Sequence, residues 1–168
     1  SRDDLLTQIT EDTTPRQFAL LLRKFAASLK EGHSEVYTGT LDEPLPHSWP
    51  IGFTLVREGI IVANLNWLAN NPGIRLGDRL IKVDGVPIDE FLKTRLEMTS
   101  ASTDHAQRVI AVDRLHWSDS TTVQLTFMKQ DESLIEETFQ CLKGRIDYRP
   151  RKQSEFCTYK TLKDKITY

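Results

Sequence analysis

The stretch NNPGIRLGDRLIKVDGVPI, residues 70–88, constrains the fold of this chain more than any other. A short apolar strand is expected between two glycine-containing turns. Gly77 can take a positive φ just before the strand, and Asp78 can accept backbone N–H groups in the same turn. Asp84 and Gly85 favour a tight turn directly after the strand. The glycines therefore predict sharp reversals, and no phosphate-binding loop is expected because neither GxxxxGKS/T nor GxGxxG occurs.

An amphipathic helix is predicted over residues 14–31, because apolar residues recur there at the spacing i, i+3, i+4 and i+7. Thr14 can act as its N-cap, and Gln17 can complete a capping box. Gly32 is expected to end the helix. A short helix is expected to precede it at residues 3–9 and to pack on it.

A proline-rich stretch, DEPLPHSWP at residues 42–50, separates this helical part from the rest of the chain. Its prolines remove backbone donors and fix φ, so a domain boundary is expected there. Short β-branched runs, two helical patterns and a hairpin follow, which predicts the α+β class. The expected strands cover residues 51–56, 59–65 and 78–85, the expected helices 88–99 and 102–117, and the expected hairpin 121–128 and 134–141.

The composition argues against several kinds of partner. With 22 Lys and Arg against 24 Asp and Glu, the formal net charge is −2, so no basic field is available for nucleic acid or an anionic membrane. No apolar run approaches the roughly 20 residues of a membrane helix. The histidines and the two cysteines, Cys141 and Cys157, show no metal-ligand spacing, so no metal or cofactor is expected. The cysteines are either unrelated thiols or, in an exported protein, a disulfide pair.

Part of the sequence resembles a known family. GIRLGDRLIKVDGVPI is similar to the short-helix, Gly-Asp, strand, Asp-Gly signature of bacterial PDZ domains, and PIGFTLV is similar to their carboxylate-binding loop and the strand that follows it. The resemblance covers residues 46–142 and implies a PDZ-like, partly open β-barrel. A simple PDZ domain has one helix where this chain has room for two. The resemblance implies that the second, residues 103–115, flanks the groove and that the first is a helical insertion.

The resemblance also implies a binding site for peptide or protein C-termini. In a PDZ groove an extended peptide adds as a strand to the sheet edge, and backbone N–H groups, here those of residues 51–53, hold its carboxylate. The strand and the flanking helix form an apolar pocket for the last side chain. The implied peptide-binding residues are Ile51, Gly52, Phe53, Thr54, Leu55, Val109 and Val112. The alternative is that Ile51 and Phe53 belong to the core and that the N-terminal helix covers this edge.

A wider resemblance includes the N-terminal part. A helix ending LLRKFAASLKEGHSEVY, a proline-rich step and a PDZ domain with a helical insertion are together similar to the front half of tail-specific (carboxy-terminal processing) serine peptidases. EGHS resembles the Asp-Gly-His-Ser/Thr element of that family, with Glu31 in place of Asp. TLKDKITY, residues 161–168, resembles the strand that opens its catalytic domain, which uses a Ser–Lys pair.

The resemblance implies three parts. They are an N-terminal helical segment at residues 1–45, a PDZ-like domain at 46–142, and a lead-out at 143–168 toward a catalytic domain missing from this sequence. The basic, polar stretch GRIDYRPRKQSEF, residues 144–156, is expected to be a solvated connection. The implied function is that of a non-catalytic substrate-recognition region of an exported serine peptidase, in the periplasm or another extracytoplasmic compartment.

No catalytic residue is expected within this chain. His33 and Ser34 are adjacent after a helix, and adjacent residues rarely face each other as a Ser–His pair must, so His33 is expected to cap or pack. The parent protein, by family resemblance, is a serine endopeptidase whose catalytic residues lie outside these residues. One alternative is a free-standing PDZ-type peptide-binding or scaffold module. Another is a unit whose groove is blocked and which serves only for packing.

Overall fold

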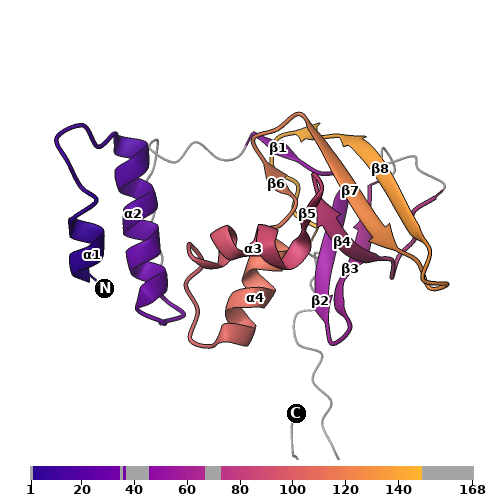
Figure 1. Ribbon diagram of the computed structural model, residues 1–168, viewed down its shortest axis with the longest axis horizontal. Coiled ribbons are helices and arrows are strands. Elements are labelled where there is room, and N and C mark those ends of the chain that lie inside the picture. The colour runs from indigo at the N-terminus through magenta and orange to yellow at the C-terminus, as the bar shows by residue number, and fades with distance from the viewer. Residues whose placement is uncertain (1, 35, 37–45, 67–72, 149–168) are drawn as a thin grey trace, which may run out of the picture.

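The computed structural model describes residues 2–34, 36, 46–66 and 73–148 (Figure 1). The order of helices and strands confirms the predicted α+β class. The elements are α1 (Arg2–Leu6), α2 (Pro15–Ser28), β1 (His47–Ser48), β2 (Ile51–Val56), β3 (Gly59–Leu65), β4 (Arg79–Val83), β5 (Val86–Pro87), α3 (Ile88–Leu96), α4 (Asp104–Asp113), β6 (Trp117–Ser118), β7 (Thr122–Met128), β8 (Leu134–Gln140) and β9 (Leu142–Lys143).

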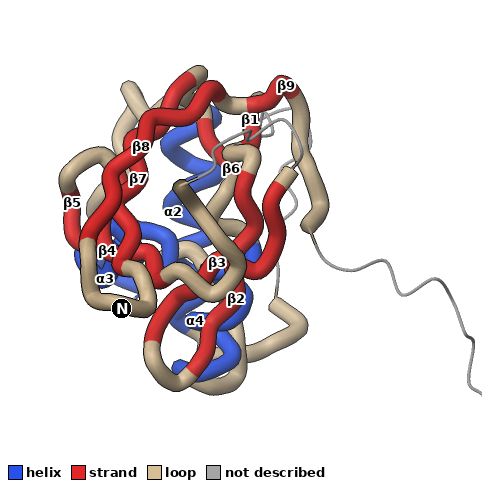
Figure 2. Tube along the Cα trace, turned by 90° about the vertical axis from the view of Figure 1, so that its right-hand side faces the viewer, coloured by secondary structure: helices blue, strands red, loops and turns tan. Residues whose placement is uncertain are grey.

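The strands form two open sheets, and neither closes into a barrel within the described residues. The larger sheet is six-stranded, with the order β2-β3-β4-β7-β8 and β5 paired to β4 (Figure 2). The smaller sheet has the order β6-β1-β9. All pairs whose register is defined are antiparallel. The larger sheet therefore ends in two edge strands, β2 and β8.

One hydrophobic core lies between the larger sheet and helices α3 and α4. Its most completely buried members come from strands β2, β3, β4 and β7, from both helices and from the turn after α4, together with Trp49 at the entry to β2. The Trp49 indole meets the Phe53 ring edge-on, with 6.1 Å between ring centroids. Burying these apolar side chains is the main source of stability for such a unit. The fully buried large side chains are Trp49, Ile51, Val62, Leu80, Val83, Leu92, Val112, Leu115, Leu125 and Phe127.

The turns predicted around β4 are confirmed. Gly77 has a φ of 89°, and the Asp78 carboxylate accepts the Arg75 N–H at 2.8 Å. Asp84 and Gly85 have φ values of 48° and 78° and connect β4 to β5. Two successive positive φ values are typical of a type I′ turn, which suits an Asp-Gly pair. Local sequence chemistry therefore determines both ends of this strand.

Helix α2 begins as predicted but ends earlier. Thr14 accepts the Gln17 N–H, and the Gln17 side chain in turn accepts the Thr14 N–H at 2.8 Å, which completes the capping box. The helix stops at Ser28, and Lys30, not Gly32, takes the left-handed conformation with a φ of 51°. The prediction that Gly32 ends the helix is therefore wrong. Gly32 is instead a point of close approach, since an added Cβ would lie 2.8 Å from the Ser102 hydroxyl.

The N-terminal helices lie on the side of α3 and α4 that faces away from the larger sheet (Figure 1). Polar contacts join α2 to the connection between α3 and α4: Lys24 pairs with Glu97 at 3.1 Å, and Ser100 donates to the Ala26 carbonyl at 3.3 Å. Exposed ion pairs of this kind contribute little stability. None of the helices in the described residues combines the length and the apolar character needed to cross a bilayer.

Candidate functional site

The candidate site is the edge of the larger sheet formed by β2. Among the described strands β2 pairs with β3 alone, so its other edge is not covered by a strand. Helix α4 packs alongside β2, as both views show (Figures 1 and 2). Helix α3 packs instead against β4, β5 and α4. An edge strand next to a helix can accept an additional strand between them.

The predicted binding residues divide into a buried and an accessible set. Ile51, Phe53 and Val112 are buried members of the core, as the alternative interpretation expected for the first two. Thr54 is exposed and Leu55 half-buried, and Val109 on α4 is 43% exposed. The side chains that can meet a partner at this edge are therefore those of Thr54, Leu55 and Val109. Gly52 is buried.

Helix α2 does not cover this edge. In Figure 1 helices α3 and α4 lie between α2 and β2, so the N-terminal helices are on the far side of the flanking helix. The idea that the N-terminal helix blocks β2 is therefore wrong. The uncovered strand edge and the exposed Val109 lie at the same place on the surface because α4 runs beside β2.

Backbone groups at the entry to β2, residues 49–52, are held by three different segments. The Trp49 N–H donates to the His116 carbonyl at 2.7 Å, and the Pro50 carbonyl accepts the Asn66 N–H at 2.9 Å. The register with β3 then shifts between Gly52 and Phe53, where Ala63 has no partner in β2. The strand therefore begins in a fixed conformation rather than in a free loop.

The third segment is the chain after β9, which we call the strap, residues 144–148. It was expected to be a solvated connection, and this is wrong for the strap, because Ile146 and Tyr148 are half-buried against the small sheet and the entry to β2. The Tyr148 hydroxyl donates to the Trp49 carbonyl at 2.9 Å. Sequence reasoning missed Tyr148. The apolar residue at every second position, Ile146 and Tyr148, was the available signal.

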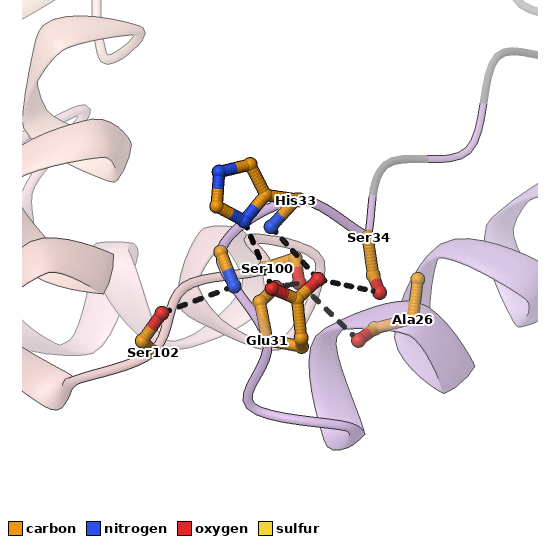
Figure 3. A network of polar contacts seen from close by, with 7 residues as sticks. Ala26, Glu31, His33, Ser34, Ser100 and Ser102 are labelled. Atoms are coloured by element: carbon orange, nitrogen blue, oxygen red, sulfur yellow. Dashed lines mark hydrogen bonds and ion pairs between the residues drawn. The ribbon is translucent and has the colours of Figure 1, made fainter.

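His33 and Ser34 do not form a nucleophile pair, since both turn toward the Glu31 carboxylate (Figure 3). Glu31 accepts the His33 backbone N–H at 2.8 Å, the Ser34 hydroxyl at 2.9 Å, and lies 3.0 Å from His33 Nδ1. The hydrogen bond to His33, followed by that to Ser34, lowers the pKa of Glu31. The His33 side chain is exposed, so the prediction that it packs is wrong, and its imidazole interacts with Glu31, beyond the C-cap of α2 at Leu29, so it does not cap that helix.

The same turn connects the N-terminal segment to the body. Gly32 donates its N–H to the Ser102 hydroxyl at 3.1 Å, and the Ser100 hydroxyl donates to the Glu31 carbonyl at 2.6 Å (Figure 3). The EGHS element is therefore a structural corner in this protein. Its hydrogen-bond donors and acceptors are used internally, and the His33 imidazole is bound to Glu31 and is not directed at the Ser34 hydroxyl as a Ser–His pair requires.

Burial raises the pKa of the Cys141 thiol to about 11, which keeps it protonated and unreactive at neutral pH. Cys157 and residues 161–168 lie outside the described residues, so the disulfide alternative and the predicted strand there stay predictions. Among the described residues no group of three or more His, Cys, Asp or Glu side chains could hold a metal ion.

Comparisons with known proteins point to one family. The profile described as "Bacteroidetes, Peptidase, S41 family, N-terminal domain" matches residues 55–138, which is half of the 168-residue chain. No curated protein matches the sequence.

Several solved structures have a similar fold, and two of them are of mature CPAF. The crystal structure of mature CPAF has a TM-score of 0.61 and 18% identity, covering 80% of this chain and 26% of that one. The structure of mature CPAF complexed with lactacystin has a TM-score of 0.60 at 18% identity, with the same two coverages. At such identity the likeness concerns the fold alone. The chain spans about a quarter of the length of these structures.

Proposed function

Because this chain belongs to the family of N-terminal domains of Bacteroidetes S41 peptidases, we propose that it is the non-catalytic substrate-recognition part of a serine peptidase. In this proposal residues 46–142 are a PDZ-like domain that binds extended peptides, and in particular protein C-termini. Residues 1–45 are a helical segment docked on it, and residues 143–168 lead toward a catalytic domain. The parent peptidase acts in the periplasm or another extracytoplasmic compartment.

One observation carries the proposal: β2 is an edge strand with α4 packed beside it. A peptide that adds to β2 satisfies the backbone groups at the edge that no other described strand pairs, and it places alternate side chains toward α4. Leu55 and Val109 offer it apolar surface, while Thr54 stays in water. Phe53 and Val112 are buried apolar residues of β2 and α4, so we expect the site to favour a peptide with an apolar end.

The experiment is a titration of the chain with fluorescent peptides that end in an apolar residue. Each peptide is used as the free acid and as the C-terminal amide, and a third version carries N-methyl groups on alternate amides. Binding of the acid, with about tenfold weaker binding of the amide, is expected if backbone N–H groups hold the carboxylate. The N-methylated peptide should not bind, since it cannot complete the added strand.

Variants locate the site. Val109→Glu places a charge beside the proposed pocket and should weaken binding by about tenfold or more. The matched control is Leu134→Glu, at an exposed apolar residue of β8 on the opposite edge of the same sheet, and it should bind like the wild type. Equal effects of the two variants, or no binding of any peptide, would contradict the proposal and favour a unit that only packs.

The free-standing module remains the alternative function. It shares the groove and differs in having no peptidase domain attached, so peptide binding does not separate the two. Hydrolysis of the bound peptide by the parent protein, lost in a parent carrying Val109→Glu but kept with Leu134→Glu, would support the recognition role. Unchanged hydrolysis in the first variant would argue for a separate role.

A further inference from the structure

We propose that the strap, residues 144–148, fixes the backbone conformation of residues 49–52 at the entry to β2 from the outer face of the sheet. We further propose that Tyr148 is a positioning residue for peptide binding. The binding role rests on the proposed function of β2, whereas the mechanical role of the strap stands on contacts within the chain.

The strap is fastened to the small sheet before it reaches β2. Ser48 in β1 donates its hydroxyl to the Gly144 carbonyl at 2.8 Å and accepts the Ile146 N–H at 3.0 Å. The Ile146 carbonyl lies 2.6 Å from His116 Nε2 and accepts a hydrogen bond from its N–H. The Arg145 guanidinium lies over the Trp117 ring at 4.0 Å. Ser48 and His116 are buried, so these hydrogen bonds are shielded from water and are costly to break.

Tyr148 forms the contact with the entry to β2. Its hydroxyl donates to the Trp49 carbonyl at 2.9 Å, while the Trp49 N–H is already bound to the His116 carbonyl. Its ring meets the His116 ring edge-on, with 4.9 Å between centroids. Both peptide groups of Trp49 are therefore fixed. Burial of the phenol raises the pKa of Tyr148 to about 12, which keeps the hydroxyl a donor at all physiological pH values.

Gly52 is the residue against which Tyr148 packs. A Cβ added at Gly52 would lie 2.6 Å from both Cβ and Cγ of Tyr148, a distance that side chains do not tolerate. The φ of Gly52 is not in the left-handed region, so the backbone itself would accept another residue. The absence of a side chain at position 52 is thus required by Tyr148 and not by the turn.

Tyr148 supports β2 without filling the place of a peptide. Successive residues of a strand point to opposite faces, and Ile51 and Phe53 point into the core on the side of α4. Gly52 therefore faces outward, and Tyr148 lies on that outer face. The backbone of a peptide between β2 and α4 would lie at the strand edge, whereas Tyr148 lies over the outer face at Gly52. The strap acts on binding through the conformation of residues 49–52.

The experiment is a double-mutant cycle on the full chain. Gly52→Ala should weaken binding of the free-acid peptide by about tenfold, because the new methyl group displaces Tyr148 and frees the Trp49 carbonyl. Tyr148→Gly should weaken it by a similar factor. In the Tyr148→Gly background, Gly52→Ala should have little further effect, since the atoms it meets are gone. Tyr148→Phe, which loses one hydrogen bond and keeps the ring, should weaken binding by about threefold to tenfold.

A second measurement does not depend on peptide. In the wild type, nuclear Overhauser contacts between the Gly52 α-protons and the Tyr148 ring are expected, with slow hydrogen exchange of the Trp49 amide. Tyr148→Gly should speed that exchange. If no peptide binds but these contacts are present, the proposed function is wrong, while the structural role of the strap at residues 49–52 is supported. The strap proposal is overturned if the contacts are absent. It is also overturned if the changes in binding free energy caused by Gly52→Ala and Tyr148→Gly are additive in the double variant.

Discussion

Asp78 is a buried carboxylate with one partner in its own turn and another from a distant part of the chain. It is 4% exposed, accepts the Arg75 N–H at 2.8 Å, and lies 3.2 Å from Lys129 Nζ. Lys129 also donates to the Gly73 carbonyl. The Lys129 ammonium group therefore joins the end of β7 to the turn before β4. The Asp78 carboxylate supplies the counter-charge that a partly buried ammonium group needs.

Asp78→Asn should lower the free energy of unfolding by about 2 kcal/mol, because the amide keeps an acceptor for Arg75 but leaves Lys129 without its counter-charge. Urea unfolding followed by tryptophan fluorescence measures the loss. Asp12→Asn, at an exposed turn residue, is the control and should unfold like the wild type. A loss no larger than that of the control would show that the pair contributes nothing.

Residues with local partners were predictable, and residues with distant partners were not. Asp78 was predicted to accept a backbone N–H because such bonds form within one turn. Lys129 as its ion-pair partner was not predictable, since the pairing of β4 with β7 brings it there. Tyr148 is the same case for the candidate site: a basic, polar neighbourhood suggested a solvated segment, whereas tertiary contacts bury the ring against Gly52.

At the scale of elements, the periodic patterns identified most helices and strands correctly. The strands at β2, β3, β7 and β8 and the helices α3 and α4 lie within or close to the predicted ranges. The end of α2 was wrong because Gly32 suggested a C-cap, and the close approach to Ser102 instead requires this glycine. A sequence does not distinguish these two uses of glycine, since both depend only on the missing side chain.

The capping box of α2 allows an element-scale test. Thr14→Ala removes the oxygen that accepts the Gln17 N–H and should destabilise α2 by about 1 kcal/mol. Far-UV circular dichroism during urea unfolding measures it. Thr14→Ser keeps the hydroxyl and should unfold almost like the wild type. Equal stabilities of the Ala and Ser variants would mean that the cap does not hold the helix.

At the scale of the whole molecule, the small sheet joins the two ends of the sheet-containing part. Strand β1 pairs with both β6 and β9, so the start of this part, the segment after α4 and the chain that leaves it meet at one place. His116 is buried at this junction. Its Nε2 donates to the Ile146 carbonyl, and its Nδ1 has no hydrogen-bond partner in the described part of the chain.

Burial at this junction lowers the pKa of His116 below its ordinary value of about 6.5. The Ile146 carbonyl, Asp113 and Asp147 oppose the shift, and Arg95 adds to it. Between pH 6.5 and the lowered pKa the unfolded chain therefore binds more protons at this site than the folded chain. Stability from His116 is fully present above pH 6.5 and falls as the pH decreases through that window.

Thermal unfolding at a series of pH values should show this loss, because protonation puts a buried N–H on Nδ1 without an acceptor. His116→Gln, which does not titrate, should be less stable at neutral pH but should lose the slope just below pH 6.5. His105→Gln, on the exposed surface of α4, is the matched control and should keep the slope. The same slope in all three proteins would assign it to other groups. As the pH falls through this window, the protection of the Trp49 amide against hydrogen exchange, relative to its intrinsic rate, should also decrease. The reason is that His116 binds the strap through its side chain and the Trp49 N–H through its carbonyl.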